Sequence, residues 1–151
     1  MSKGLGVLMR TAALLAWIPG LAFGLPCVYA IWYLAEHGHV WTIMSFPAYG
    51  AGPFEDVGID TTVPLLAAFL VVCAAELVVG WMLWQRRRAG AVLALALLPL
   101  ELAFWIGFAL PLPPVAGVAR TTIIVMAWPG LRGAMTPLRH PSTSEGSWRE
   151  R

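Results

Sequence analysis

Three ionisable residues, Glu76, Glu101 and Arg120, lie inside otherwise apolar stretches of the chain. Charged side chains are rare in such stretches because burying an ionised group away from water is costly. Where they occur in membrane helices, they usually face the interior of the bundle and mark proton relays or ion and substrate sites. The trio is therefore the first candidate for a functional site.

Helix geometry predicts which of the three residues meet. At 1.5 Å per residue, Glu101 and Arg120 lie roughly 17 to 18 Å from the same end of their helices, whereas Glu76 lies roughly 12 Å from that end. Only the short segment 110–114 separates the helices of Glu101 and Arg120, so these helices are antiparallel neighbours. We predict an ion pair between Glu101 and Arg120, with Glu76 left without a cation. A buried, unpaired carboxyl is expected to hold or exchange a proton near neutral pH, which makes Glu76 the leading functional residue.

A second group of residues has side chains that bind metals. His37 and His39, with Glu55 and Asp56 further along, offer the nitrogen and oxygen ligands that zinc or manganese accepts. No HExxH or CxxC motif accompanies them. A metal site here is an alternative to the simpler interpretation of polar residues in a loop.

The same segment, from His37 to Asp60, also carries four aromatic residues that argue against disorder: Trp41, Phe46, Tyr49 and Phe54. Aromatic side chains concentrate at the membrane–water boundary, which favours a loop lying on the outer interface. The alternative is a lid over a cavity between the helices, hinged at the glycines and prolines of the loop.

Four apolar stretches position these residues. They cover residues 11–35, 61–84, 89–110 and 115–131, each near the roughly 20 residues that a helix needs to cross a bilayer. Hydrophobic residues make up 59% of the 151-residue chain and charged residues 12%, too little polar surface for a soluble globule of this size. We predict an all-α membrane protein of four transmembrane helices, arranged as two antiparallel hairpins with the long aromatic loop between helices one and two.

The basic residues predict the orientation. Apart from Arg120, every Lys and Arg lies before the first stretch, between the second and third, or after the fourth. The positive-inside rule then places both termini in the cytoplasm. The first stretch is too long for the apolar part of a cleaved signal peptide and is expected to be retained. Nine arginines against one lysine, with no asparagine, suggest a bacterial source and hence the plasma membrane.

One transmembrane domain, 1–131, and a disordered basic cytoplasmic tail, 132–151, account for the whole chain. The predicted partners are the lipid bilayer and a membrane-protein partner or further copies of the chain, with no cofactor and no nucleic acid. A non-enzymatic accessory or small-ligand-binding membrane protein is the preferred function. The first alternative is a proton-linked carrier or ion-conducting component that uses Glu76 and the Glu101–Arg120 pair. The second is a membrane enzyme with a metal site on the outer face, although no nucleophile–base pair supports it.

Overall fold

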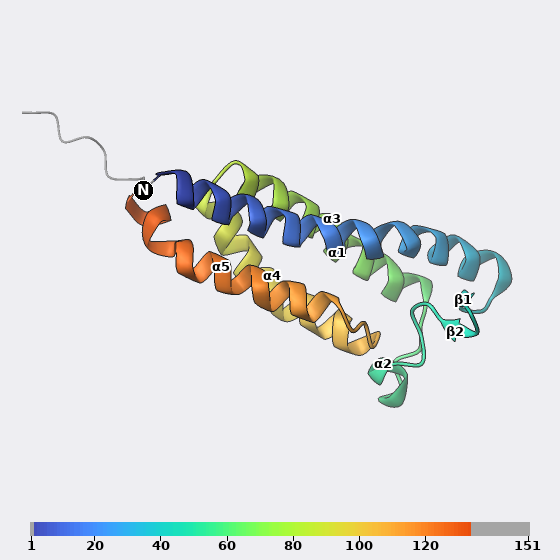
Figure 1. Cartoon of the computed structure of the whole chain (residues 1–151). Coiled ribbons are helices and arrows are strands. Elements are labelled where there is room, and N and C mark those ends of the chain that lie inside the picture. Colours follow the sequence, from blue (N-terminus) through green and yellow to red (C-terminus); the bar gives the residue numbers. More distant parts are fainter. Residues whose placement is uncertain (1, 134–151) are drawn as a thin grey trace, which may run out of the picture.

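The computed structural model describes residues 2–133, and most of them lie in four long helices (Figure 1). These are α1 (Ser2–His37), α3 (Val63–Trp84), α4 (Arg88–Gly107) and α5 (Pro113–Gly133). Between α1 and α3 lie an antiparallel pair of two-residue strands, β1 (Thr42–Ile43) and β2 (Phe46–Pro47), and the one-turn helix α2 (Pro53–Asp56). All four long helices are long and apolar enough to cross a membrane, so the chain is a multi-pass membrane protein.

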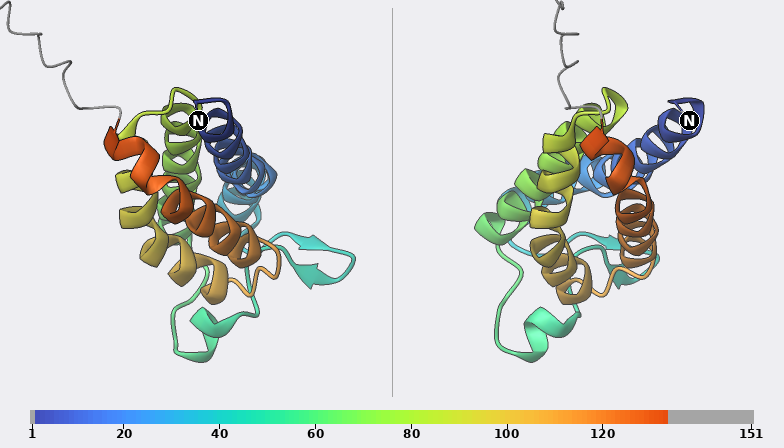
Figure 2. Two further views of the ribbon diagram at one scale, coloured as in Figure 1. Left: turned by 60° about the vertical axis from the view of Figure 1, so that its left-hand side comes forward. Right: turned by 90° about the vertical axis from the view of Figure 1, so that its left-hand side faces the viewer.

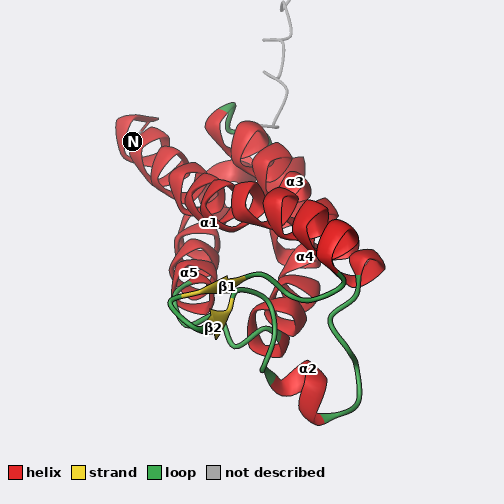
Figure 3. Cartoon of the chain, turned by 90° about the vertical axis from the view of Figure 1, so that its right-hand side faces the viewer, coloured by secondary structure: helices red, strands yellow, loops and turns green. Residues whose placement is uncertain are grey.

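The four long helices form a closed ring. α1 packs against α3 and α5, and α4 packs against the same two helices (Figure 3). The N-terminus, the α3–α4 turn and the end of α5 lie together at one end of the bundle, which we call the arginine end (Figures 1 and 2). The segment 38–62 and the α4–α5 turn lie at the opposite end, the loop end.

Two helix boundaries differ from the sequence prediction by more than two residues. α1 begins at Ser2 rather than at 11, because a long basic side chain such as that of Arg10 can stay in a helix while its charge reaches polar surroundings. α4 ends at Gly107 rather than at 110, because Ala109 has a left-handed backbone (φ 54°), which breaks the helix. The predicted tail, 132–151, lies outside the described residues apart from the last two residues of α5.

Two glycines of α1 let it approach α3 closely. A β-carbon at Gly20 would lie 3.1 Å from the Cys73 carbonyl oxygen, and one at Gly24 would lie 3.2 Å from the Cys73 β-carbon. The GxxxG spacing of Gly20 and Gly24 therefore serves packing within the chain. Both cysteines, Cys27 and Cys73, are buried and free.

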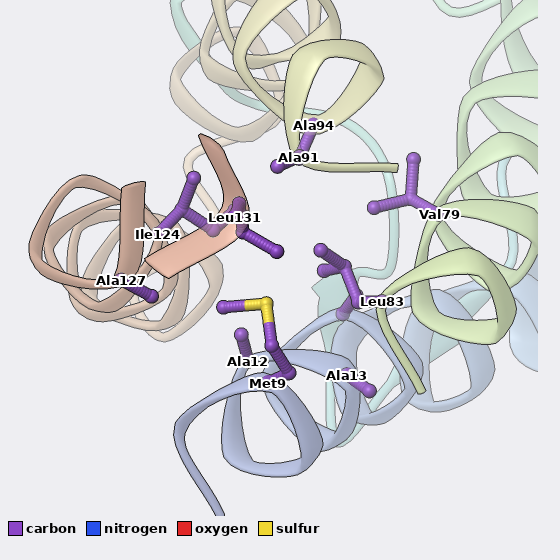
Figure 4. Close-up of a cluster of buried hydrophobic side chains, with 11 residues drawn as sticks. Met9, Ala12, Ala13, Val79, Leu83, Ala91, Ala94, Ile124, Ala127 and Leu131 are labelled. Atoms are coloured by element: carbon purple, nitrogen blue, oxygen red, sulfur yellow. The ribbon is translucent and has the colours of Figure 1, made fainter. Parts of the chain in front are cut away.

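The apolar core is divided into two clusters along the bundle axis. One fills the arginine end with small and aliphatic side chains from all four helices, which point toward one another (Figure 4). Its members include Met9, Leu83 and Ile124. The other fills the loop end and is largely aromatic, with Phe69 and Phe104 among its members. Along α3, α4 and α5 the three buried charged residues fall between these clusters or at their boundary.

Close helix approach makes one glycine of α3 sensitive to substitution. A β-carbon at Gly80 would overlap the indole of Trp17 and lie 3.1 Å from the Ala13 carbonyl oxygen. We expect Gly80→Ala to lower the unfolding free energy in detergent by about 1 to 3 kcal/mol, because the neighbours must shift to admit the methyl group. Gly4→Ala is the matched control, since a β-carbon there meets nothing within 4 Å. Equal stability of the two variants would contradict the close α1–α3 packing.

Candidate functional site

The three buried ionisable residues meet at the centre of the bundle. The Arg120 Nη2 atom donates a hydrogen bond to Glu101 Oε2, and Arg120 Nη1 lies 3.7 Å from Glu76 Oε1. All three side chains are almost completely buried, each exposing about one hundredth of its surface or less. One guanidinium therefore faces two carboxyl groups in surroundings that are otherwise apolar. We call these three residues the charge cluster.

Each of three helices contributes one member of the charge cluster. Glu76 comes from α3, Glu101 from α4 and Arg120 from α5, so the arginine side chain reaches both its neighbour α4 and the diagonally opposite α3. The fourth helix, α1, contributes no charge. It places Gly20 against the cluster, where a β-carbon would lie 3.4 Å from the Glu76 β-carbon.

Local sequence explains how two of these side chains reach the centre. Pro99 precedes Glu101 by two residues and cannot donate the helical hydrogen bond to the Leu95 carbonyl, so α4 is weakened beside the cluster. On α5, Gly117 is one turn before Arg120, and a β-carbon there would lie 2.6 Å from the Trp105 ring. The missing side chain lets α5 approach α4 closely enough for Arg120 to pair with Glu101.

The prediction of a Glu101–Arg120 ion pair is confirmed, and the prediction that Glu76 has no cation is wrong. The roughly 5 Å difference in depth between Glu76 and Arg120 predicts that the two side chains do not meet. The long and flexible arginine side chain spans that difference across the bundle. Cys73 and Gly80 on the Glu76 face of α3, and Gly117 on the Arg120 face of α5, are buried as well.

Several polar atoms of the charge cluster have unused hydrogen-bonding capacity. Among the described residues, no hydrogen-bond partner is present for the buried atoms Glu76 Oε1, Glu101 Oε1, Arg120 Nε and Arg120 Nη1. Buried polar atoms of this kind are usually paired, so each exception calls for an explanation. Two acceptors and two donors in one place suit a small polar ligand or a shared proton.

The structure does not gather the predicted metal ligands. The rings of His37 and His39 lie 6.0 Å apart, and both pack against Tyr33 at the end of α1. Glu55 instead accepts hydrogen bonds from the Ala51 amide and the Thr61 hydroxyl. Within residues 2–133, no group of three or more His, Cys, Asp and Glu side chains is placed to hold a metal ion.

The four aromatic residues of the 38–62 segment have different surroundings. Phe46 is 76% exposed, and Trp41 is half-buried against Tyr29. Tyr49 is buried between Phe69 and Phe108. Phe54 packs edge-on against Phe104 and Phe108. Tyr49 thus belongs to the bundle core at its loop end, and Trp41 and Phe54 pack against that core, which their aromatic character alone does not predict.

Tyr49 also fixes the segment to α1. Its hydroxyl donates a 2.7 Å hydrogen bond to the Phe23 carbonyl oxygen, and the Thr61 hydroxyl donates to the Tyr49 carbonyl oxygen. Burial raises the pKa of the Tyr49 phenol, so the hydroxyl keeps its proton and remains a donor. The segment therefore lies across part of the loop end of the bundle (Figure 3).

The chemistry available to the charge cluster follows from its own groups. No protein-family model, curated protein or solved structure matches this chain. The groups of the cluster can bind a cation, move a proton or fix the helices. Its net charge is −1 when all three members are ionised.

We expect the three members of the charge cluster to differ in their contribution to stability. Arg120→Gln leaves two carboxyl groups without a cation and should cost about 3 to 5 kcal/mol of unfolding free energy. Glu76→Gln leaves the closer Glu101–Arg120 pair with balanced charge and should cost much less. Reversible unfolding in mixed micelles measures both values.

Two further variants control this comparison. Thr122→Val, on the exposed face of α5, should have little effect because it removes only a hydrogen bond to the Val118 carbonyl oxygen. The double variant Arg120→Gln with Glu101→Gln should recover part of the loss, since only one carboxyl then remains. A Glu76→Gln protein as unstable as Arg120→Gln would show that Glu76 is required as an ion.

Proposed function

We propose that this chain is a non-enzymatic plasma-membrane protein whose charge cluster binds one proton as its small ligand. The observation that carries the proposal is that two carboxyl groups share a single guanidinium at the centre of the bundle. Two carboxylates in one buried site resist ionising together, because each disfavours the charge of the other. One bound proton brings the net charge of the cluster from −1 to zero.

The surroundings of Glu76 support the proton as the ligand. The ionisable groups facing it are Glu101 from α4 and Arg120 from α5, with the Cys73 thiol one turn away on α3. α1 faces it with Gly20, which carries no charge. No second cation among the described residues neutralises the extra carboxylate, and a proton on either carboxyl can be donated to a free acceptor oxygen of the other.

A proton-linked carrier is the second candidate, favoured by the position of Pro99. A helix weakened two residues before Glu101 can bend there and move that carboxyl relative to Arg120. The chain would then act with further copies of itself or a membrane partner, since four helices enclose little space. The metal-enzyme alternative has no such support, because the described part of the chain holds no group of three or more side chains placed to bind a metal ion.

Proton binding predicts how stability depends on pH. If the folded cluster holds a proton that the unfolded chain releases above about pH 5, stability falls as pH rises from there. Glu76→Gln should flatten this dependence and make the protein at pH 8 as stable as the parent or more so. Melting temperatures in detergent between pH 5 and 8 test this, and the difference between parent and variant removes the contribution of titrating groups that both proteins share.

An infrared spectrum identifies the proton directly. The parent protein at pH 7 should show the carbonyl band of a protonated carboxyl, and Glu76→Gln should lose it. Parallel pH profiles for parent and variant, with no such band, would leave the charge cluster as a purely structural element. Proton uptake into liposomes that contain the parent, but not the variant, would select the carrier over the accessory protein.

The proposed orientation places both termini in the cytoplasm, with two antiparallel hairpins and the aromatic loop outside. It rests on the basic residues of the arginine end. In a variant lacking Cys27 and Cys73, a cysteine introduced for the exposed Met44 should react with an impermeant thiol reagent on intact cells. A cysteine replacing Arg87 should react only after permeabilisation. External labelling at position 87 would reverse the orientation.

A further inference from the structure

One arginine of α1 and one arginine of the α3–α4 turn both pack at the arginine end. The guanidinium of Arg86, in the α3–α4 turn, packs on α1 at Gly6, where a β-carbon would lie 2.7 Å from Arg86 Nη2. Arg10 follows Gly6 by four residues and shares its face of α1. The two guanidinium groups therefore occupy neighbouring positions on the seam between α1 and α3, about one helical turn apart.

Aromatic contacts hold Arg10 in place. Its guanidinium lies over the Trp84 ring, 5.1 Å from the centroid, and Trp84 stacks on Trp17 at 5.5 Å. The Trp17 indole nitrogen in turn donates a hydrogen bond to the Leu77 carbonyl oxygen. A guanidinium stacked in this way loses less conformational freedom when it binds an anion than a free side chain does.

No described acidic residue neutralises these two arginines. The ion pairs present among residues 2–133 are those of the charge cluster. The other acidic residues in this range lie at the loop end, on the opposite side of the bundle, and they are Glu36, Glu55, Asp56 and Asp60. Arg10 and Arg86 are both exposed, and their mutual repulsion favours an anion that contacts both.

We propose that the phosphate group of an anionic phospholipid binds between Arg10 and Arg86. Guanidinium groups bind phosphate oxygens through paired hydrogen bonds and favour them over neutral groups. Basic pockets between transmembrane helices on the cytoplasmic side bind acidic headgroups in this way. The site lies apart from the charge cluster and does not depend on proton binding there.

The apolar surface beside the site selects a lipid over a free phosphate ion. Leu14 lies one turn beyond Arg10 on the same face of α1 and is 47% exposed. Trp81 lies one turn before Trp84 on α3 and is 57% exposed. A phospholipid bound through its phosphate can lay an acyl chain along these side chains, whereas inorganic phosphate contacts the arginines alone.

The test compares two double variants that each remove two positive charges from the arginine end. Arg10→Gln with Arg86→Gln removes the proposed site, and Arg87→Gln with Arg88→Gln is the matched control. Each protein, in uncharged detergent, receives phosphatidylglycerol, phosphatidylcholine or inorganic phosphate, and its melting temperature and the lipid retained in native mass spectrometry are measured. Phosphatidylglycerol should stabilise the parent and the control. Its affinity for the site variant should be at least about tenfold weaker than for the control.

Three results would overturn the proposal. If both double variants lose phosphatidylglycerol binding equally, the lipid is attracted to the basic end in general and not to this site. If phosphatidylcholine raises the melting temperature as much as phosphatidylglycerol does, the charge of the lipid has no role. The same shift with inorganic phosphate alone would assign the site to a free anion. Arg86→Gln alone, with lipid retention measured on the folded fraction, keeps the test valid if the double variant unfolds. Glu76→Gln should bind phosphatidylglycerol as the parent does, which separates this site from the proposed proton site.

Discussion

The structure depends on one guanidinium that faces two carboxyl groups in the middle of an apolar bundle. Apolar side chains gain little from leaving lipid for the interior of a membrane protein, so they direct helix faces only weakly. A charged side chain fixes the orientation of its helix strongly, because turning the charge toward lipid is costly. Glu76, Glu101 and Arg120 each occupy a different helix, and rotation of α3, α4 or α5 would break the cluster. The cluster thus sets the rotation of three helices, and the fourth is set by its glycines.

Packing around the charge cluster bears on how the proposed proton would reach it. Toward the loop end, the Phe69, Phe104 and Phe108 rings and the docked Tyr49 lie between the cluster and the surface. Toward the arginine end, the aliphatic cluster that includes Met9 lies between the charge cluster and the surface. The proposed proton exchange would therefore require helix movement, and α4 is weakened at Pro99, two residues before Glu101.

The transmembrane spans and the Glu101–Arg120 ion pair could be predicted from the sequence because both follow from local features of the chain. Apolar length is a local property, and the short α4–α5 turn forces neighbouring helices, so Glu101 and Arg120 had to lie close together. The contact between Arg120 and Glu76 crosses the bundle between helices that do not pack against each other, and no local pattern reports such a contact. The burial of Tyr49 could not be predicted from the sequence either, because it depends on where the Phe23 carbonyl and the Thr61 hydroxyl lie in the fold.

The excess of one carboxyl distinguishes a proton-binding cluster from a purely structural one. A balanced pair of Glu101 and Arg120 suffices to hold α4 against α5, and an apolar side chain of similar volume in place of Glu76 would avoid the cost of burying a second acid. The second carboxyl stabilises the fold only while the cluster is neutral, and neutrality requires a proton. Under the proposed proton binding, Glu76 makes the stability of the bundle depend on the occupancy of a single small ligand, a property that the balanced pair lacks.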